Sequence, residues 1–203
     1  MYRTRVSRHS LLIMRLLMAL AIGLAGCSRP DTPATTPPAA SPAPPFKISA
    51  SIQDIMNFEI EPSADGLWDA VSTTVTAAGV DEKRPQTEAE WLQMRRHAIT
   101  LVEAANLLMM DGRKVLAPGQ TMADEGVEGV LSSKQVQAGI DANRQQFVQF
   151  ATLLHDTGEQ MLRAVDAKHV QGMLDAGEAL DAACESCHLV FWYPNQVIPA
   201  PED

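Results

Sequence analysis

The sequence has few aromatic residues, few cysteines and fewer basic than acidic residues. Aromatics make up 5% of its 203 residues, while ten methionines and many alanines favour helices over strands. Three cysteines are too few for a small scaffold held together by disulfides. Sixteen basic and 25 acidic residues give a formal charge of −9, which argues against a protein that binds duplex nucleic acid.

Several familiar patterns are also missing from the chain. We find no strand-like alternation longer than a few residues, no internal repeat and no glycine-rich phosphate-binding loop. No set of residues offers a general acid, a base and a nucleophile together, so we do not expect an enzyme. Hydrophobic residues still make up 46% of the chain, which is enough for one globular domain with attachments.

Residues 1–26 have the organisation of a secretion signal. Arginines between Arg3 and Arg15 give a positive start, and a short apolar run from Leu16 to Leu24 follows. This run is shorter than the roughly 20 residues of a membrane-spanning helix, although an uncleaved N-terminal anchor is the alternative. The signal predicts an exported protein.

A tether is expected between this signal and the folded domain, over residues 27–46. Seven of the residues from Arg29 to Pro45 are proline, and most of the others are small. Proline fixes φ and lacks an N–H donor, so this composition favours an extended spacer over a loop inside a domain. The folded domain is expected over residues 47–203.

Leu24-Ala25-Gly26-Cys27 resembles the bacterial lipobox, in which the cysteine is lipidated and becomes the mature N-terminus. The resemblance implies a periplasmic lipoprotein, and Ser28 after the cysteine favours the outer membrane over the inner. The mature chain would have 12 basic and 25 acidic residues, a formal charge of −13. Anionic lipids would repel such a chain, so its attachment would depend on the lipid on Cys27.

Apolar residues recur at helical spacing in four stretches of the domain. The first covers about Ala50 to Ala78, with a kink or break expected at Pro62. The second opens with the capping box Thr87-Glu88-Ala89-Glu90 and stops near Asp111-Gly112. The third begins at Ser132 or Ser133 and runs to about Val165.

The fourth stretch runs from about Val170 to Phe191, and prolines follow it. Residues 112–131, rich in glycine, are expected to form a long loop. Four amphipathic helices favour an all-α fold, a four-helix bundle.

The pentapeptide Cys184-Glu185-Ser186-Cys187-His188 is the Cys-x-x-Cys-His motif by which c-type haem is attached. Two thiols three residues apart lie one helical turn apart, so both could add to the two vinyl groups of one porphyrin. The next residue, His188, would then be the proximal ligand of the iron. A disulfide would leave His188 unexplained, a thioredoxin-like pair would need a βαβ unit, and a structural zinc site would need about four ligands.

A Cys-x-x-Cys-His motif near the C-terminus, on the last of four helices, resembles the class II c-type cytochromes, which include cytochrome c′ and its low-spin relatives. The resemblance covers roughly residues 47–198. It implies a four-helix bundle with one covalent haem c on the C-terminal helix. In this family the distal residue comes from the first helix, where Met56 is the best candidate here.

The distal residue separates two functional hypotheses. Met56 as a ligand gives a His/Met-ligated haem that transfers single electrons to redox partner proteins of the periplasm or membrane. Met56 as core filler leaves the iron five-coordinate and open to nitric oxide or carbon monoxide, with Ile52 and Ile55 beside it. A helical lipoprotein without haem is the third alternative, and the resemblance also implies a possible homodimer.

Other residues have weaker claims to a role. Any of three histidines could ligate the iron: His97, His155 and His169. Arg95 and Arg96 could pair with haem propionates, and the aromatic residues Phe191, Trp192 and Tyr193 could pack on the porphyrin edge. Acidic residues beside the motif could steer a basic redox partner: Asp175, Glu178, Asp181 and Glu185. Five further methionines fit the core better: Met94, Met109, Met110, Met161 and Met173.

Overall fold

The computed structural model describes residues 46–122 and 124–196, which belong to one compact unit running from Pro44 to Asp203. The expected signal, Cys27 and almost all of the expected tether lie outside the described residues. Within the described ranges, no helix is both long enough and apolar enough to cross a membrane.

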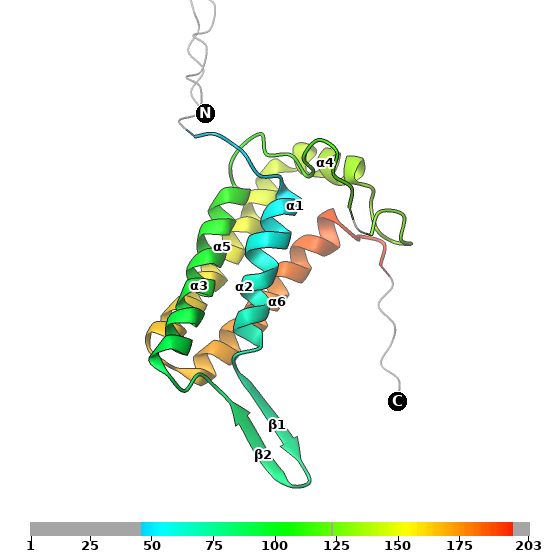
Figure 1. Cartoon of the computed structure of the whole chain (residues 1–203). Coiled ribbons are helices and arrows are strands. Elements are labelled where there is room, and N and C mark those ends of the chain that lie inside the picture. The colour runs from blue at the N-terminus through cyan, green and yellow to red at the C-terminus, as the bar shows by residue number, and fades with distance from the viewer. Residues whose placement is uncertain (1–45, 123, 197–203) are drawn as a thin grey trace, which may run out of the picture. The chain divides into compact units, whose positions relative to one another are not determined.

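The described residues are mostly helical, with one small sheet (Figure 1). In chain order the elements are α1 (Ile52–Ile55), the π-helix η1 (Met56–Ile60), α2 (Glu61–Trp68), β1 (Ser72–Thr76), β2 (Gly79–Lys83), α3 (Glu88–Leu108), α4 (Ser133–Ala142), α5 (Arg144–Asp166) and α6 (Val170–Phe191). The prediction of a mostly helical chain is therefore confirmed.

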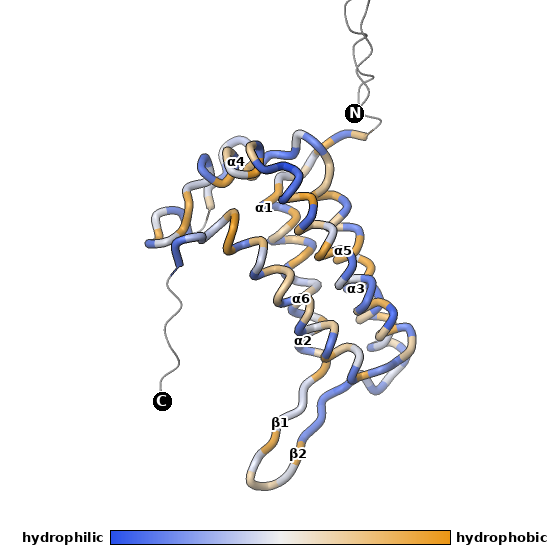
Figure 2. The backbone as a smooth tube through the Cα atoms, turned by 180° about the vertical axis from the view of Figure 1, so that it is seen from behind, coloured by the Kyte–Doolittle hydropathy of each residue, from blue (hydrophilic) through white to orange (hydrophobic). Residues whose placement is uncertain are grey.

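The long helices pack side by side around one hydrophobic core. Helix α3 packs against α5, α5 against α6, and α2 contacts both α3 and α6. Hydrophobic and hydrophilic residues alternate along α3 and α5 in Figure 2, as amphipathic helices require. Among the most deeply buried core side chains are Ile55, Leu67, Leu101, Met161, Met173 and Leu180.

The backbone stays helical through Pro62, where we expected a kink or break. The irregularity lies just before this proline, in η1, where the N–H of Glu61 donates to the carbonyl of Met56 five residues earlier. Pro62 then occupies the first turn of α2, where a backbone N–H would have no acceptor within the helix, so the missing N–H of proline costs no hydrogen bond. A wide π turn thus takes up the distortion that proline would impose on a regular α-helix.

The prediction that the first helix extends to Ala78 is wrong. Helix α2 ends at Trp68, and residues 72–83 form an antiparallel hairpin in which Val75 faces Val80. β1 consists of Ser, Thr and Val, and β-branched residues favour strands. Gly79 has a φ of +136°, a conformation that the hairpin turn requires and that glycine adopts readily. The hairpin projects from the helices in Figure 1.

The third predicted helix is two helices, because Asn143 leaves the helical conformation with φ −125° and ψ 40°. The Asn143 side chain donates to the carbonyl of Gly139 at 3.1 Å, a local hydrogen bond of the kind that competes with helix continuation. The remaining boundaries agree closely with the predictions. α6 has the expected bounds, the Thr87–Glu90 capping box is formed, and the described residues between 112 and 131 contain no helix or strand.

Gly158 brings α3 and α5 close together, and this gives a testable prediction. A Cβ at Gly158 would lie 3.1 Å from Cγ2 of Val102, whereas one at Gly139 would meet only an ordinary contact of 3.7 Å. We expect Gly158→Ala to lower the free energy of unfolding by about 1–3 kcal/mol through overpacking. Gly139→Ala is the matched control and should raise it by about 0.5–1 kcal/mol through helix propensity. Urea unfolding of both variants measures the difference, and equal effects would contradict the close approach.

Candidate functional site

The two cysteines and the histidine of the motif lie on α6 and face a cavity in the helical body. Cys184 and Cys187 are one turn apart, are partly buried and are both free thiols. Cys187 and His188 line both lobes of the cavity, and Cys184 lines one of them. The disulfide alternative is therefore not realised in the structure.

The first lobe, called here the helical lobe, lies between the α1–η1–α2 segment, α5 and α6 and has a volume of about 240 Å³. Met56, Ile60, Ala64 and Trp68 recur at intervals of four residues and form its wall on the first segment. Helix α5 contributes the facing apolar wall, which includes Phe150 and Leu154.

The second lobe, the loop lobe, has a volume of about 410 Å³ and extends toward α4 and the loop after α3. Val115 and Met122 come from this loop, and Val136 and Ile140 come from α4. Seven residues line both lobes: Met56, Asn57, Glu61, Phe147, Cys187, His188 and Trp192. The two volumes together fall within the range of about 300–1,000 Å³ that is typical of small-molecule sites.

Met56 and His188 belong to the same cavity although they are far apart in sequence. Met56 stands at the junction of α1 and η1 and is partly buried, while Ile55 beside it is fully in the core. A thioether and an imidazole can each ligate a transition metal, and a pair of thiols can anchor an organic cofactor covalently. The cavity therefore combines two side chains that can ligate a metal, Met56 and His188, with two thiols that can form covalent bonds to a cofactor.

Burial keeps the two thiols protonated. It raises the pKa of Cys184 to about 11, with a further contribution from the negative charge of Asp181. Burial likewise raises the pKa of Cys187 to about 12, and the neighbouring Cys184 adds to the effect. Desolvation lowers the pKa of His188, which favours the neutral imidazole, the form that binds metals.

The aromatic residues after the motif take two different positions. Phe191 belongs to the core, where it meets Phe147 edge-on with ring centroids 5.6 Å apart. Trp192 lies edge-on against His188 at 4.8 Å. Tyr193 also contacts the His188 ring, and its hydroxyl donates to Glu185 at 2.6 Å. These contacts fix the orientation of the imidazole.

One buried polar atom at the site has no hydrogen-bond partner. The indole N–H of Trp192 is inaccessible to solvent and donates to no other described residue. Buried N–H groups are rarely left without an acceptor, so this one is consistent with a bound group that is not part of the chain.

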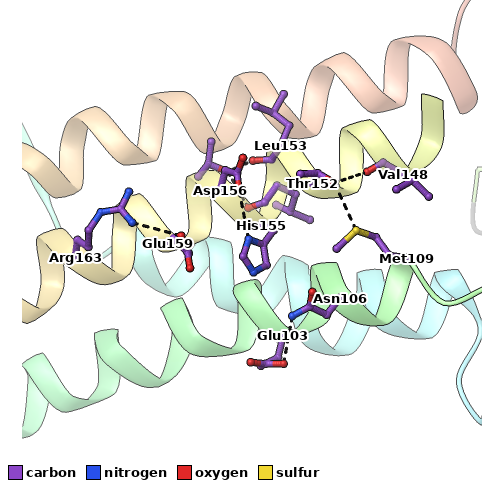
Figure 3. Close-up of polar contacts among 12 residues, drawn as sticks. Glu103, Asn106, Met109, Val148, Thr152, Leu153, His155, Asp156, Glu159 and Arg163 are labelled. Atoms are coloured by element: carbon purple, nitrogen blue, oxygen red, sulfur yellow. Dashed lines mark hydrogen bonds and ion pairs between the residues drawn. The ribbon is translucent and has the colours of Figure 1, made fainter. Parts of the chain in front are cut away.

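The other candidate ligands lie away from the cavity. His155 pairs with its neighbour Asp156 on α5 (Figure 3), and His97 contacts Gln93 on α3. His169 is the N-cap residue of α6. Arg95 pairs with Asp166 rather than with anything in the cavity. The remaining candidates line neither lobe: Arg96, Met94, Met109, Met110, Met161 and Met173.

A hydrogen-bonded clamp holds the loop after α3 against the start of α1. Asp54 accepts from the backbone N–H of Ser51 at 2.8 Å and from the side-chain amide of Gln120 at 2.6 Å. The buried guanidinium of Arg113 donates to the carbonyls of Ala50 and Leu107. Neighbours of these residues in the chain, Gln53 and Thr121, line the loop lobe. Sequence reasoning missed the clamp because its two long-range pairs, Asp54–Gln120 and Ala50–Arg113, are more than sixty residues apart.

The clamp predicts a specific pH dependence. Hydrogen bonds from the Ser51 backbone, the Gln120 amide and the Ser51 hydroxyl lower the pKa of Asp54 below its ordinary range. The stability that this carboxylate contributes is therefore fully present above the ordinary carboxyl pKa and is lost as the pH falls through the lower folded value. We expect Asp54→Asn to flatten the acid side of the stability–pH curve measured by thermal unfolding. Gln120→Leu should flatten it partly, and an unchanged curve in Asp54→Asn would contradict the assignment.

The described residues contain no group of three or more His, Cys, Asp and Glu side chains that could hold a metal ion. A structural zinc site, which needs about four such ligands, finds no support in this part of the chain.

The chain matches no known family model, and neither a curated protein nor a solved structure with significant similarity to it was found.

Proposed function

We propose that this protein is a c-type cytochrome that transfers single electrons, with one covalent haem c in the cavity that the two lobes form. The observation that carries the proposal is the Cys-x-x-Cys-His motif on α6, whose cysteines and histidine line an apolar cavity with Met56 in the wall that the first helical segment supplies. In this proposal α2, α3, α5 and α6 are the four helices of a class II cytochrome bundle.

The residues of the cavity fit such a group. Protonated thiols at Cys184 and Cys187 are the reactants for addition to two vinyl groups, and a neutral imidazole follows directly at His188. The lining is apolar apart from a few residues that include Asn57, Glu61 and Asp65, each of which is exposed at the rim. The partnerless N–H of Trp192 adds a buried donor beside the site.

Each residue then has a defined role. Cys184 and Cys187 would hold the haem by thioether bonds, and His188 and Met56 would supply the two protein ligands of its iron. When bound, the haem supplies an iron that exchanges one electron between ferric and ferrous states. A thioether ligand favours the ferrous state and raises the potential, while the apolar walls exclude water. Trp192 and Tyr193 hold the His188 ring in one orientation.

The cellular setting is part of the proposal. Export by residues 1–26 and lipidation of Cys27 would place the domain on the periplasmic side of a membrane, and Ser28 favours the outer membrane over the inner. The Pro-rich spacer would give it reach toward redox partner proteins. A homodimer is compatible with the resemblance and is tested by sedimentation of the holoprotein.

Absorption spectra of the exported holoprotein test the proposal. We expect covalent haem by mass, a low-spin spectrum in both the oxidised and the dithionite-reduced protein, and no change when carbon monoxide is added. A spectrum that shifts with carbon monoxide would overturn the Met56 ligation and make gas binding the function. Mature protein without covalent haem would overturn the cytochrome assignment itself.

A further inference from the structure

Trp68 separates the helical lobe from a second hollow that opens to solvent. This surface hollow has a volume of about 340 Å³ and is lined by Trp68, Val71, Met173, Leu174, Gly177, Glu178 and Asp181. Trp68 also lines the helical lobe, together with Cys184. One indole ring therefore contacts the proposed cofactor cavity and an open hollow on the α2–α6 surface.

The indole is held in this position by α6. Its N–H donates to the carbonyl of Gly177 at 3.1 Å. A Cβ at position 177 would lie 3.2 Å from Cδ1 of Trp68, so the absence of a side chain at Gly177 lets the ring lie against the helix. A ring fixed by a hydrogen bond and by close contact gives the hollow a rigid floor.

The hollow is negatively charged. Glu178 and Asp181 are exposed, and no lysine or arginine lines the hollow. Glu185 continues the same helical face four residues beyond Asp181. An apolar floor with an acidic border complements a surface that is cationic around an apolar contact, and like-charged partners would be repelled.

We infer that the surface hollow docks the cationic face of a redox partner protein, with Trp68 as the contact between this partner and the cofactor cavity. The inference rests on the proposed function, because it assumes that electrons leave the cavity. One electron passes between the reduced and the oxidised protein of the pair, and no bond or proton is exchanged. Trp68 shortens the path through the protein between the docked partner and the cofactor cavity. Glu178 and Asp181 attract the cationic partner as it approaches.

The first experiment measures binding without electron transfer. Hexaamminecobalt(III), a cation of charge +3, is titrated into the full protein while the three tryptophan indole signals are followed by NMR. Trp68→Phe assigns the Trp68 signal. We expect a saturable shift of this signal that is lost in the double variant Glu178→Lys/Asp181→Lys. A shift spread equally over all three indoles, or none at Trp68, would overturn the docking site whether or not haem is present.

The second experiment measures the oxidation rate of the dithionite-reduced holoprotein by tris(phenanthroline)cobalt(III), a cation, and by ferricyanide, an anion. We expect the Glu178→Lys/Asp181→Lys variant to react about tenfold more slowly with the cation and faster with the anion at low ionic strength. The matched control is Glu103→Lys/Glu159→Lys, which changes the net charge equally at exposed positions on α3 and α5 (Figure 3).

The comparison with this control decides the result. A similar rate change in both double variants would mean that overall charge, and not the hollow, controls the encounter, and would overturn the inference. A protein without haem would fail the proposed function in the mass measurement, while the NMR titration would still test the hollow. The two failures are therefore distinguishable.

Discussion

Replacing both Cys184 and Cys187 with alanine is expected to abolish covalent haem attachment completely. The two thiols are the only cysteines of the motif, and both line the cavity beside His188. Without them, any haem in the cavity would be held only by axial ligation and apolar contacts, and acid–acetone extraction would remove it. The measurement is the mass of the denatured protein together with the haem absorbance that remains on it.

Two controls make this result specific. Each single variant retains one thiol and should keep a haem with a single thioether, which alters the spectrum of the reduced pyridine complex. Cys27→Ala removes the third cysteine of the chain and should leave the attachment unchanged while it abolishes lipidation. Covalent haem on the double variant would show that the motif is not the attachment site.

Met56→Ala is expected to convert a closed low-spin site into an open one. The Met56 side chain lines both lobes of the cavity, and its truncation would remove the distal sulfur and leave space beside the iron. We expect a high-spin spectrum, rapid binding of carbon monoxide and a fall in the reduction potential on the order of 100 mV, since axial ligands set haem potentials over roughly 0.8 V.

Met122→Ala is the matched control, because Met122 lines only the loop lobe. This variant removes a thioether from the same cavity but should leave the spectrum low-spin and unresponsive to carbon monoxide. If Met56→Ala also kept the low-spin spectrum, Met56 would be a core residue and another group would be the sixth ligand. If Met122→Ala alone opened the site, the ligand would come from the loop.

Local sequence signals predicted the parts of the fold that depend on local interactions. Thr87 and Glu90 predict the start of α3, because both residues of a capping box lie within four positions of the chain. The hairpin was missed because Val71 and Val75 are also spaced as in a helix, and only the β-branched residues between them favour a strand. Asn143 was missed for a similar reason, since the apolar spacing continues across it while its backbone does not.

The candidate site also has one part that local sequence signals predict and another part that depends on contacts between distant residues. The motif on α6 could be recognised from five consecutive residues, and the spacing of Met56, Ile60 and Ala64 could have indicated the wall of the helical lobe. The loop lobe could not be predicted, because it depends on the contact of Gln120 with Asp54 and on the backbone hydrogen bond from Gln53 to Val115. Neither pair has a local sequence signature.

The position of the anchoring cysteines on the last helix has a consequence for biosynthesis. Because α6 supplies one wall of the cavity, a chain that lacks α6 has neither the two thiols nor the cavity that they face. In the proposed cytochrome, a chain interrupted before α6 would therefore have no site to fill, and haem could be attached only after α6 has been synthesised. Maturation in this arrangement would discriminate between copies with α6 and copies without it.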